Sequence, residues 1–267
     1  MCWLKKLAII KLGGSAITVK DKFKEPREEI IKQAGQEIAE AIKTEGYRVI
    51  LVHGGGSFGH PVAHKYGLKE GLKTLESKIG FSETIDAMRE LNLIVSRILR
   101  ELNLPIMPIQ PSAISLMDND KLISMHLDVI LRALDEGFIP LLWGDPVLDL
   151  TKGCTILSGD DIIHYLAKVI KPKVVVFGTN VDGVFLDFPK NQELVHKIDE
   201  SNLREVLEAI RPVSYRDVTG GFYRKMNRII DISKQGIRVY IVNLFKKGRL
   251  LKALMMKDDA GTLIEVK

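Results

Sequence analysis

Short apolar runs alternate along the chain with longer stretches in which apolar residues recur every three or four positions. Three short runs have the length and β-branched content of buried strands: Leu7–Lys11, Tyr47–Val52 and Val174–Phe177. The stretch from Arg27 to Glu45 has helical spacing, with Pro26 expected at its first turn and Gly46 at its end. A strand, a helix and a second strand in this order predict a parallel β-α-β unit.

The same two patterns continue to the end of the chain. We expect further helices at Glu76–Leu102, His126–Glu136, Asp160–Ile170, Ser201–Ile210 and Tyr223–Gln235. We expect further strands at Pro105–Ile109, Phe138–Trp143, Arg238–Val242 and Thr262–Val266, and a hairpin within Val147–Leu157. The segment Leu250–Met256 fits a helix or a buried strand. These elements predict an α/β protein with a mostly parallel central sheet. We expect a single domain over residues 1–267, with two lobes at about 1–170 and 171–267 that meet near Lys171-Pro172.

Composition narrows the class of protein. The 267 residues carry a formal charge of +5, and lysines and arginines are spread among acids rather than clustered as in a nucleic-acid-binding arm. Only two cysteines are present, Cys2 and Cys154, which is typical of a reducing cytoplasm. No apolar run approaches the roughly 18 residues that a membrane span requires. We therefore expect a cytoplasmic protein whose partners are small molecules, with no nucleic acid and no membrane.

Glycine-bearing loops follow three of the predicted strands. Their sequences are Lys11-Leu12-Gly13-Gly14-Ser15, His53-Gly54-Gly55-Gly56-Ser57-Phe58-Gly59-His60 and Thr179-Asn180-Val181-Asp182-Gly183-Val184. One Gly-Gly turn alone is more often simple turn chemistry, but loops at the carboxyl ends of parallel strands converge on one site. Glycines let backbone N–H groups surround an anion, and a following helix adds its positive end. A fourth such loop is Asp217-Val218-Thr219-Gly220-Gly221, followed by Arg224-Lys225. Together the loops predict a phosphate-binding site.

Two familiar fingerprints fit the second loop only in part. Its glycine spacing starts like a dinucleotide-binding motif. The acidic residue expected about 20 positions on, at the end of a second strand, would fall near Thr74–Glu76, but that region is rich in Lys and Glu and helix-like. It also starts like a P-loop, yet His60-Pro61 stands where Lys-Ser/Thr belongs. His60 and His64 are spaced like a helical metal pair, but no Glu lies between them, and Pro61 predicts that His60 precedes the helix. We expect none of these three sites.

Charged residues beside the loops have two interpretations each. Lys11 ends a buried strand and is either a snorkelling surface lysine or a phosphate contact, and the following Gly-Gly favours the contact. Lys20 would ordinarily be a solvated charge. Ser158-Gly159-Asp160-Asp161 fits plain helix capping, but it also fits acids that orient lysines or hold a cation.

Taken in order, these segments resemble the amino acid kinase superfamily over nearly the whole chain. Within it, Gly56-Ser57-Phe58-Gly59-His60-Pro61-Val62-Ala63 is similar to the isopentenyl phosphate kinase family, as are Gly144-Asp145 and Ser158–Asp161. The histidine is the discriminating element, because relatives that act on carboxylates lack it. The resemblance implies an αβα sandwich of the amino acid kinase fold, usually dimeric, that uses ATP and Mg²⁺ to convert isopentenyl phosphate to the diphosphate in isoprenoid biosynthesis.

The resemblance also implies roles for individual residues. Catalytic roles fall to Lys11, Lys20, His60, Asp160 and Lys225, the lysines as transition-state cations and Asp160 as their orienting acid. The acceptor phosphate would be bound by Gly55, Gly59, His60 and Gly159. The nucleotide would be bound by Lys11, Gly13, Gly14, Ser15, Gly56, Thr179, Asn180, Asp182, Gly183, Gly221 and Lys225. No metal-ligating residue is named: phosphates and water can supply most Mg²⁺ ligands, and whether a protein carboxylate adds one is left open by the sequence. Asn180 stands where the family commonly has Asp, which changes its expected contact.

Two other functions remain open at this point. A fosfomycin-kinase-like activity would use a similar loop for a small phosphonate. A non-catalytic nucleotide sensor on the same fold would have lost the phosphate lysines, yet Lys11, Lys20 and Lys225 are all present. Phe81 and Met88 belong to an apolar stripe that is either core or a wall for the isoprenoid tail.

Overall fold

A sheet of eight strands runs through the centre of the molecule. The computed structural model describes residues 6–187, 190, 192–210 and 221–267. In spatial order the strands are β12 (Lys197–Ile198), β14 (Thr262–Ile264), β13 (Arg238–Asn243), β9 (Val174–Thr179), β1 (Leu7–Leu12), β2 (Arg48–His53), β6 (Ile139–Trp143) and β3 (Ile106–Pro108). Neighbours are parallel except for β13 and β14. The strand after Lys171-Pro172 lies directly beside β1, so both halves of the chain build one sheet.

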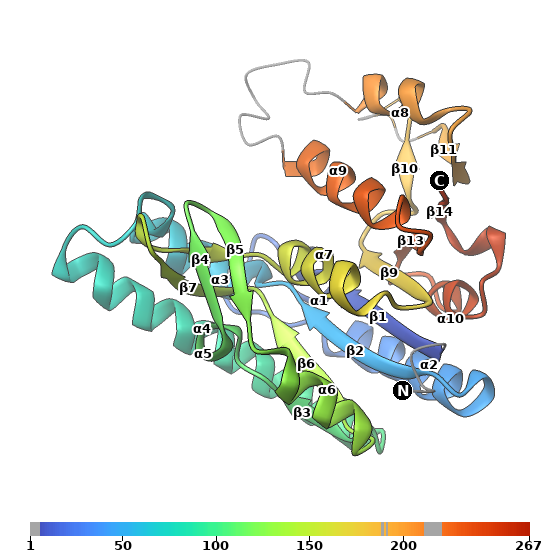
Figure 1. Ribbon diagram of the computed structural model, residues 1–267. Coiled ribbons are helices and arrows are strands. Elements are labelled where there is room, and N and C mark those ends of the chain that lie inside the picture. Colours follow the sequence, from blue (N-terminus) through green and yellow to red (C-terminus); the bar gives the residue numbers. More distant parts are fainter. Residues whose placement is uncertain (1–5, 188–189, 191, 211–220) are drawn as a thin grey trace.

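Helices cover both faces of this sheet (Figure 1). One face carries α2 (Glu28–Glu45), α4 (Leu75–Glu101) and α10 (Arg249–Leu254), and the other carries α6 (Leu127–Asp135), α7 (Gly159–Ile170) and α9 (Gly221–Ser233). Because side chains alternate along a strand, Leu7 and Ile9 enter the core beneath α7, whereas Ala8 and Ile10 enter the core beneath α2. The predicted αβα sandwich is confirmed, and the ambiguous segment 250–256 is mostly helix.

A second, four-stranded sheet extends from the end of β6. Its order is β5 (Lys121–Met125), β4 (Ser115–Asp118), β7 (Asp145–Asp149) and β8 (Gly153–Leu157). The predicted β7–β8 hairpin is present, but the β4–β5 hairpin was not expected from the sequence. Its turn is Asn119-Asp120, with φ of +46° and +64°, the residue types that tolerate a left-handed turn. The Asp149 carboxylate accepts the backbone N–H of both turn residues and of Lys152, which joins the two hairpin turns.

Shorter elements connect these layers. They are α1 (Gly14–Ile17), α3 (Gly56–Lys65), α5 (Pro111–Ile114), α8 (Leu203–Ala209), β10 (Val184–Phe185), β11 (Leu194–Val195) and two 3₁₀ turns at Leu68–Glu70 and Asp258–Ala260. Within the described ranges, no helix is both long and apolar enough to cross a membrane.

Two expectations at prolines were wrong. The second helix begins at Glu28, and Pro26 lies before it, in a β-bridge with Thr18. His60 and Pro61 lie inside α3 rather than before it. Pro61 has no N–H to donate to the Ser57 carbonyl four residues earlier, and that carbonyl accepts the Lys24 N–H instead, at 3.3 Å. The loop before α2 thus supplies the hydrogen bond that the proline removes.

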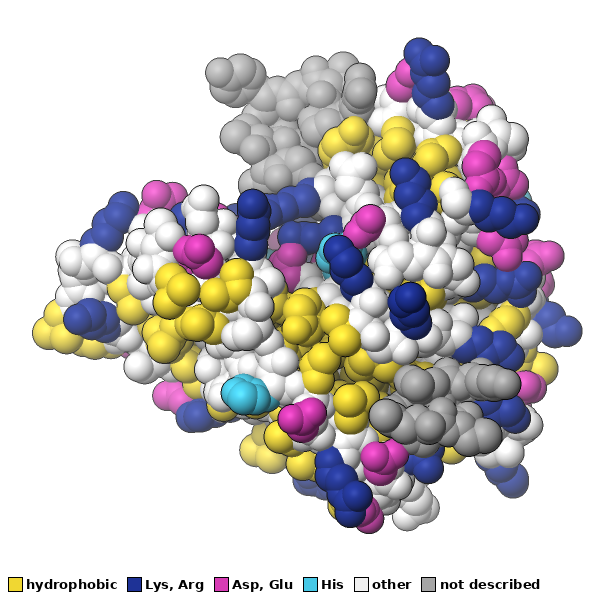
Figure 2. Space-filling model, in the orientation of Figure 1, with side chains coloured by type: hydrophobic (Ala, Val, Ile, Leu, Met, Phe, Trp, Pro, Cys, Tyr) yellow, Lys and Arg dark blue, Asp and Glu magenta, His cyan; other side chains and the backbone are white. Residues whose placement is uncertain are grey.

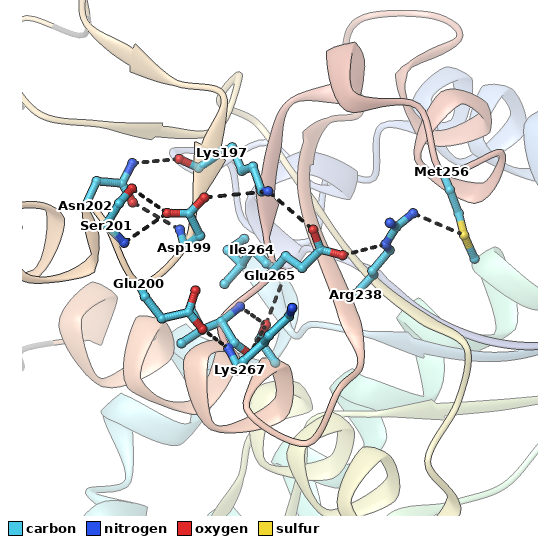
Figure 3. A network of polar contacts seen from close by, with 12 residues as sticks. Lys197, Asp199, Glu200, Ser201, Asn202, Arg238, Met256, Ile264, Glu265 and Lys267 are labelled. Carbon is cyan, nitrogen blue, oxygen red and sulfur yellow. Dashed lines mark hydrogen bonds and ion pairs between the residues drawn. The ribbon is translucent and has the colours of Figure 1, made fainter.

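At the outer edge of the sheet, Glu265 lies between two cations (Figure 3). Its carboxylate is 2.9 Å from Arg238 Nε and 3.4 Å from Lys197 Nζ. These contacts join the first residues of β12 and β13 to the residue that follows β14. Asp199 accepts the Ser201 N–H in the turn that leads to α8. These pairs are largely exposed, so each stabilises the edge by only about 0–1 kcal/mol.

Candidate active site

The centre of the site is an ion pair between β1 and α7. Lys11 follows Leu7 and Ile9 on the face of β1 that is covered by α7, so its side chain reaches the first turn of that helix. Lys11 Nζ lies 2.5 Å from Asp160 Oδ1, and Lys11 as a whole residue is only 9% exposed. Burial raises the pKa of Asp160, but the Lys11 and Lys225 ammonium groups outweigh it and hold that pKa below its usual range. Asp160 is therefore an anion that orients a buried lysine.

Lys225 brings a second cation to this pair. It lies in the first turns of α9, and its Nζ is 5.4 Å from the centre of the Phe177 ring, which is the β9 neighbour of Lys11 in the sheet. Burial and the charge of Lys11 lower the pKa of Lys225 to about 8, against the opposing effect of Asp160. Two ammonium groups close to one carboxylate leave a net positive charge, which suits a bound phosphate.

The glycine loops after β1 and β2 lie back to back. A Cβ on Gly14 would come within 2.4 Å of the Gly56 N, and a Cβ on Gly54 within 2.7 Å of the Gly14 N. Gly56 also has a φ of +48°, which favours glycine. Helices α1 and α3 begin at these loops, so their first N–H groups, which lack partners within the helix, lie close together. Gly159 opens a third helix beside them, with Lys11 Cε 3.5 Å from where its Cβ would be.

His60 stands at the rim of the second loop, on α3. Its ring is exposed, and its Cδ2 lies 3.2 Å from the position that a Cβ on Gly55 would occupy. The protein atoms around the ring remove part of its solvent, and this desolvation lowers the pKa of His60, as do the charges of Lys11 and Lys69. The ring is therefore neutral at pH 7 and donates one N–H. Gly55 and Gly59 both face the Met88 sulfur of α4, which would be 3.1 and 2.4 Å from added Cβ atoms. A side chain at Gly59 would displace the Met88 side chain, so this glycine lets α3 pack closely on α4.

The loop after β9 contacts the loop after β1. Ser15 Oγ donates to Asn180 Oδ1 at 3.2 Å, so the residue that differs from the family pattern still joins these two loops. Thr179 Oγ1 lies 2.9 Å from the Val181 carbonyl in its own turn and 3.1 Å from the Val242 carbonyl, and its single hydrogen can be donated to either. Gly183 packs against Thr262, whose Oγ1 would be 2.2 Å from a Cβ there. This arrangement fixes the turn at the end of β9.

The Asp182 carboxylate is held by an amide at the end of β13 and by a lysine in the turn that follows. It accepts from Asn243 Nδ2 at 3.0 Å and from Lys246 Nζ at 2.8 Å. Burial raises the pKa of Asp182, but the hydrogen bonds from these two side chains bring it below its usual range. Asn243 and Lys246 were not found from the sequence, because Asn243 ends β13 and Lys246 lies in the turn after it, about 60 residues from Asp182 in the chain.

The structure places most of the predicted residues together, with some exceptions. Lys11, Asp160 and Lys225 form one cluster, and the Gly13 N–H donates to the Gly178 carbonyl of β9 at 2.9 Å, which joins the first loop to that strand. Lys20 is exposed in the loop after α1 and takes no part in the Lys11–Asp160 contact. Gly221 is the first residue of α9, whereas Asp217 to Gly220 lie outside the described residues.

His53 supports the second glycine loop through buried contacts. It is fully buried, stacks on Trp143 and makes polar contacts with the Gly54 carbonyl at 3.1 Å and Asn92 Nδ2 at 3.2 Å. Burial lowers the pKa of His53 to about 4, which outweighs the opposing effect of its bond to Gly54. A neutral imidazole with its Nδ1–H donated to Gly54 and its Nε2 accepting from Asn92 satisfies both contacts.

The described acids and histidines do not gather as metal ligands. Among the described residues no three His, Cys, Asp or Glu side chains lie close enough together to hold a metal ion. One oxygen of Asp160 already accepts from Lys11. The described side chains therefore form no metal site of their own.

Comparisons with known proteins agree with this geometry. The model of the amino acid kinase family matches residues 6–243. The isopentenyl phosphate kinase of Methanocaldococcus jannaschii is 34% identical over 97% of this chain and 98% of its own length, and that of Arabidopsis thaliana is 31% identical over 88% and 86%. A solved isopentenyl phosphate kinase structure superposes with a TM-score of 0.81 at 28% identity, covering 97% of this chain and 99% of the other.

A second solved structure, a substrate complex of isopentenyl phosphate kinase, has a TM-score of 0.78 and 28% identity, and covers 97% of this chain and all of that one. The family match at residues 6–243 includes the glycine loops, Lys11, Asp160 and Lys225, and the two relatives above 30% identity cover 97% and 88% of this chain. The chain belongs to the amino acid kinase family, in its isopentenyl phosphate kinase branch.

Proposed function

We propose that this chain transfers the γ-phosphoryl group of ATP to isopentenyl phosphate and releases isopentenyl diphosphate and ADP. The observation that carries this proposal is the meeting of the two glycine loops beside the Lys11–Asp160 pair, with His60 on the side of the second loop. Two relatives that align with most of this chain are named isopentenyl phosphate kinase. The first loop, with Gly13, Gly14 and Ser15, would hold the ATP phosphates.

The acceptor's charge explains why no general base is needed. A phosphate monoester has a second pKa of about 6 and is largely dianionic at neutral pH. One of its oxygens attacks the γ-phosphorus as the bond to the ADP oxygen breaks. The chain has to align two anions and offset their repulsion. The charges of Lys11 and Lys225 would offset it, and His60 and backbone N–H groups would donate hydrogen bonds to the phosphates. Mg²⁺, which accompanies ATP in such transfers, would be held chiefly by phosphate oxygens and water.

The remaining roles follow the same division. Gly55, Gly59, His60 and Gly159 would bind the acceptor phosphate, and Thr179, Asn180, Asp182, Gly183 and Gly221 would lie around the nucleotide. Lys20 would complete the set of cations on closure around both substrates. The acceptor lobe is then residues 1–170 and the nucleotide lobe 171–267, within a single domain that we place in the cytoplasm.

An acceptor comparison tests this function. ADP release is measured with ATP and, in turn, isopentenyl phosphate, dimethylallyl phosphate and fosfomycin. We expect the highest kcat/KM with isopentenyl phosphate, slower turnover of its isomer and little turnover of fosfomycin. Preference for fosfomycin would favour the phosphonate kinase alternative, and ATP binding without turnover of any acceptor would favour a nucleotide sensor.

We further propose that the protein is a homodimer. Apolar side chains gather on one surface, over the β4–β5 hairpin and over α6 and α7 (Figure 2). The exposed large apolar residues on these elements and on the adjacent strand β7 are Ile123, Val129, Leu148 and Val169, which are 43–53% exposed. Such a patch suits an interface with a second copy. Light scattering should give twice the mass of one chain, and Leu148→Lys should shift it toward the single-chain mass. A single-chain mass for the unaltered protein would contradict the dimer.

The pH dependence of activity should report Lys225. Because the pKa of Lys225 is about 8 in the free protein, raising the pH through 8 removes a cation that ATP phosphates need. We expect kcat/KM for ATP to fall about tenfold per pH unit above that value. In Lys225→Arg, whose side chain stays charged, the remaining activity should not fall over this range. An alkaline limb of the same position in Lys225→Arg would assign the titration to another group.

A further inference from the structure

The side chain of Thr18 lies where the two glycine loops meet. Thr18 follows α1 directly and is fully buried. Its Oγ1 donates to the Gly14 carbonyl at 2.8 Å, on the nucleotide side, and accepts the Ser57 N–H at 3.0 Å, in the first turn of the helix that carries His60. One hydroxyl therefore joins the two loops by a hydrogen bond to each. No motif in the sequence singles this residue out.

The contact leaves no room for the loops to shift toward each other. A Cβ on Gly56 would lie 2.1 Å from Thr18 Oγ1 and 2.7 Å from the Gly14 carbonyl oxygen. The Thr18 hydroxyl donates its single hydrogen to the Gly14 carbonyl. Its lone pairs are left to accept the hydrogen bond from the Ser57 N–H. Both the spacing and the orientation of the two loops are thus set by this group.

The loop that carries Lys20 starts from the same point. The Thr18 carbonyl accepts Arg27 Nε at 3.2 Å at the base of the loop. Further along, the Lys24 N–H bonds the Ser57 carbonyl that Pro61 leaves free, and Lys24 Nζ pairs with Glu90 on α4. The Lys20 loop is therefore anchored to Thr18 and to α3, the helix of the acceptor side.

We propose that Thr18 is a positioning residue that sets the separation between the ATP phosphates and the acceptor phosphate. The inference rests on the proposed function, because it needs a nucleotide on the first loop and an acceptor on the second. In-line transfer depends steeply on this separation, and a misplacement of about 1 Å can cost about 100-fold in rate. Thr18 touches neither substrate in this account, so its loss affects alignment more than binding.

Thr18→Val keeps the shape of the side chain and removes both hydrogen bonds. We expect kcat to fall about 30- to 100-fold, while the KM values for ATP and isopentenyl phosphate each change less than about threefold. Thr18→Ser should recover most of the lost kcat, because it restores the hydroxyl. If Thr18→Val does not fold, Thr18→Ala and Thr18→Ser form the decisive pair, since they differ only by the hydroxyl.

Thr84→Val is the matched control. Thr84 is also buried and also donates to the carbonyl four residues before it, Gly80, at 2.7 Å, but it joins no two loops. The Thr84→Val variant should have a lower melting temperature. Its kcat should stay within about twofold of that of the unaltered protein. Thr18→Val with unchanged kcat, or Thr18→Ser as impaired as Thr18→Ala, would overturn the role of Thr18. An unaltered protein that turns over no isopentenyl phosphate would instead overturn the proposed function.

Discussion

Replacing His60 with alanine should abolish turnover of the acceptor phosphate while leaving the affinity for ATP nearly unchanged. His60 is the side chain on the acceptor side of the joined loops that can donate a hydrogen bond from an exposed position. Loss of one such donor costs about 100-fold or more when charge must be placed for reaction. Because the ring is exposed, the variant should fold normally. Activity with saturating ATP and ATP affinity by calorimetry measure the two halves of this prediction.

His64→Ala is the control for His60→Ala. His64 lies one turn further along the same helix and is also exposed, so the same truncation is made away from the glycine loop. Its kcat/KM should remain within about twofold of the unaltered protein. His60→Gln, which retains an N–H donor, should keep more activity than His60→Ala. A parallel fall in ATP affinity and turnover in His60→Ala would assign the histidine to the nucleotide instead.

Replacing Asp160 with asparagine should lower kcat by about 100- to 1,000-fold. The side chains have nearly the same volume, but the substitution removes the one negative charge between Lys11 and Lys225. Since Asp160 raises the pKa of Lys225, its loss should lower that pKa below about 8. The alkaline limb of the activity profile should then begin at a lower pH than in the unaltered protein. Steady-state rates between pH 6 and about 9 test both effects.

Asp231→Asn provides the matched change of charge. Asp231 lies on α9, the helix of Lys225, and pairs with His164 away from the phosphate loops. It should leave kcat and the position of the alkaline limb nearly unchanged. A lowered kcat in Asp160→Asn with an unmoved limb would mean that Asp160 does not act through Lys225.

The sequence predicted the layers of this fold well because its strands are buried on both faces. Such strands appear as continuous apolar runs, and Leu7–Leu12 and Val174–Thr179 lie at the centre of the sheet. The β4–β5 hairpin was missed because its strands are only partly buried and do not alternate clearly. Pro61 was misjudged because a backbone bond from Lys24, distant in the sequence, compensates for the missing N–H.

The site was predicted where glycines and lysines carry a local signal, and it was missed where contacts are long-range. Lys11 stood out at the end of a buried strand, and its partner Asp160 lies 149 residues away. Thr18, Asn243 and Lys246 gave no comparable signal, because their importance comes from what the fold places beside them. The resemblance named residues in the loops, whereas the residues that fix the loops became visible only in three dimensions.

The most direct test of the central claim is the product formed by the unaltered protein. Phosphorus NMR of a mixture with ATP, Mg²⁺ and isopentenyl phosphate should show two coupled signals of a new diphosphate, in amounts equal to the ADP released. The same mixture without isopentenyl phosphate should release almost no ADP. ADP that appears with orthophosphate, regardless of the acceptor, or no new phosphorus–oxygen–phosphorus linkage, would contradict phosphoryl transfer to isopentenyl phosphate.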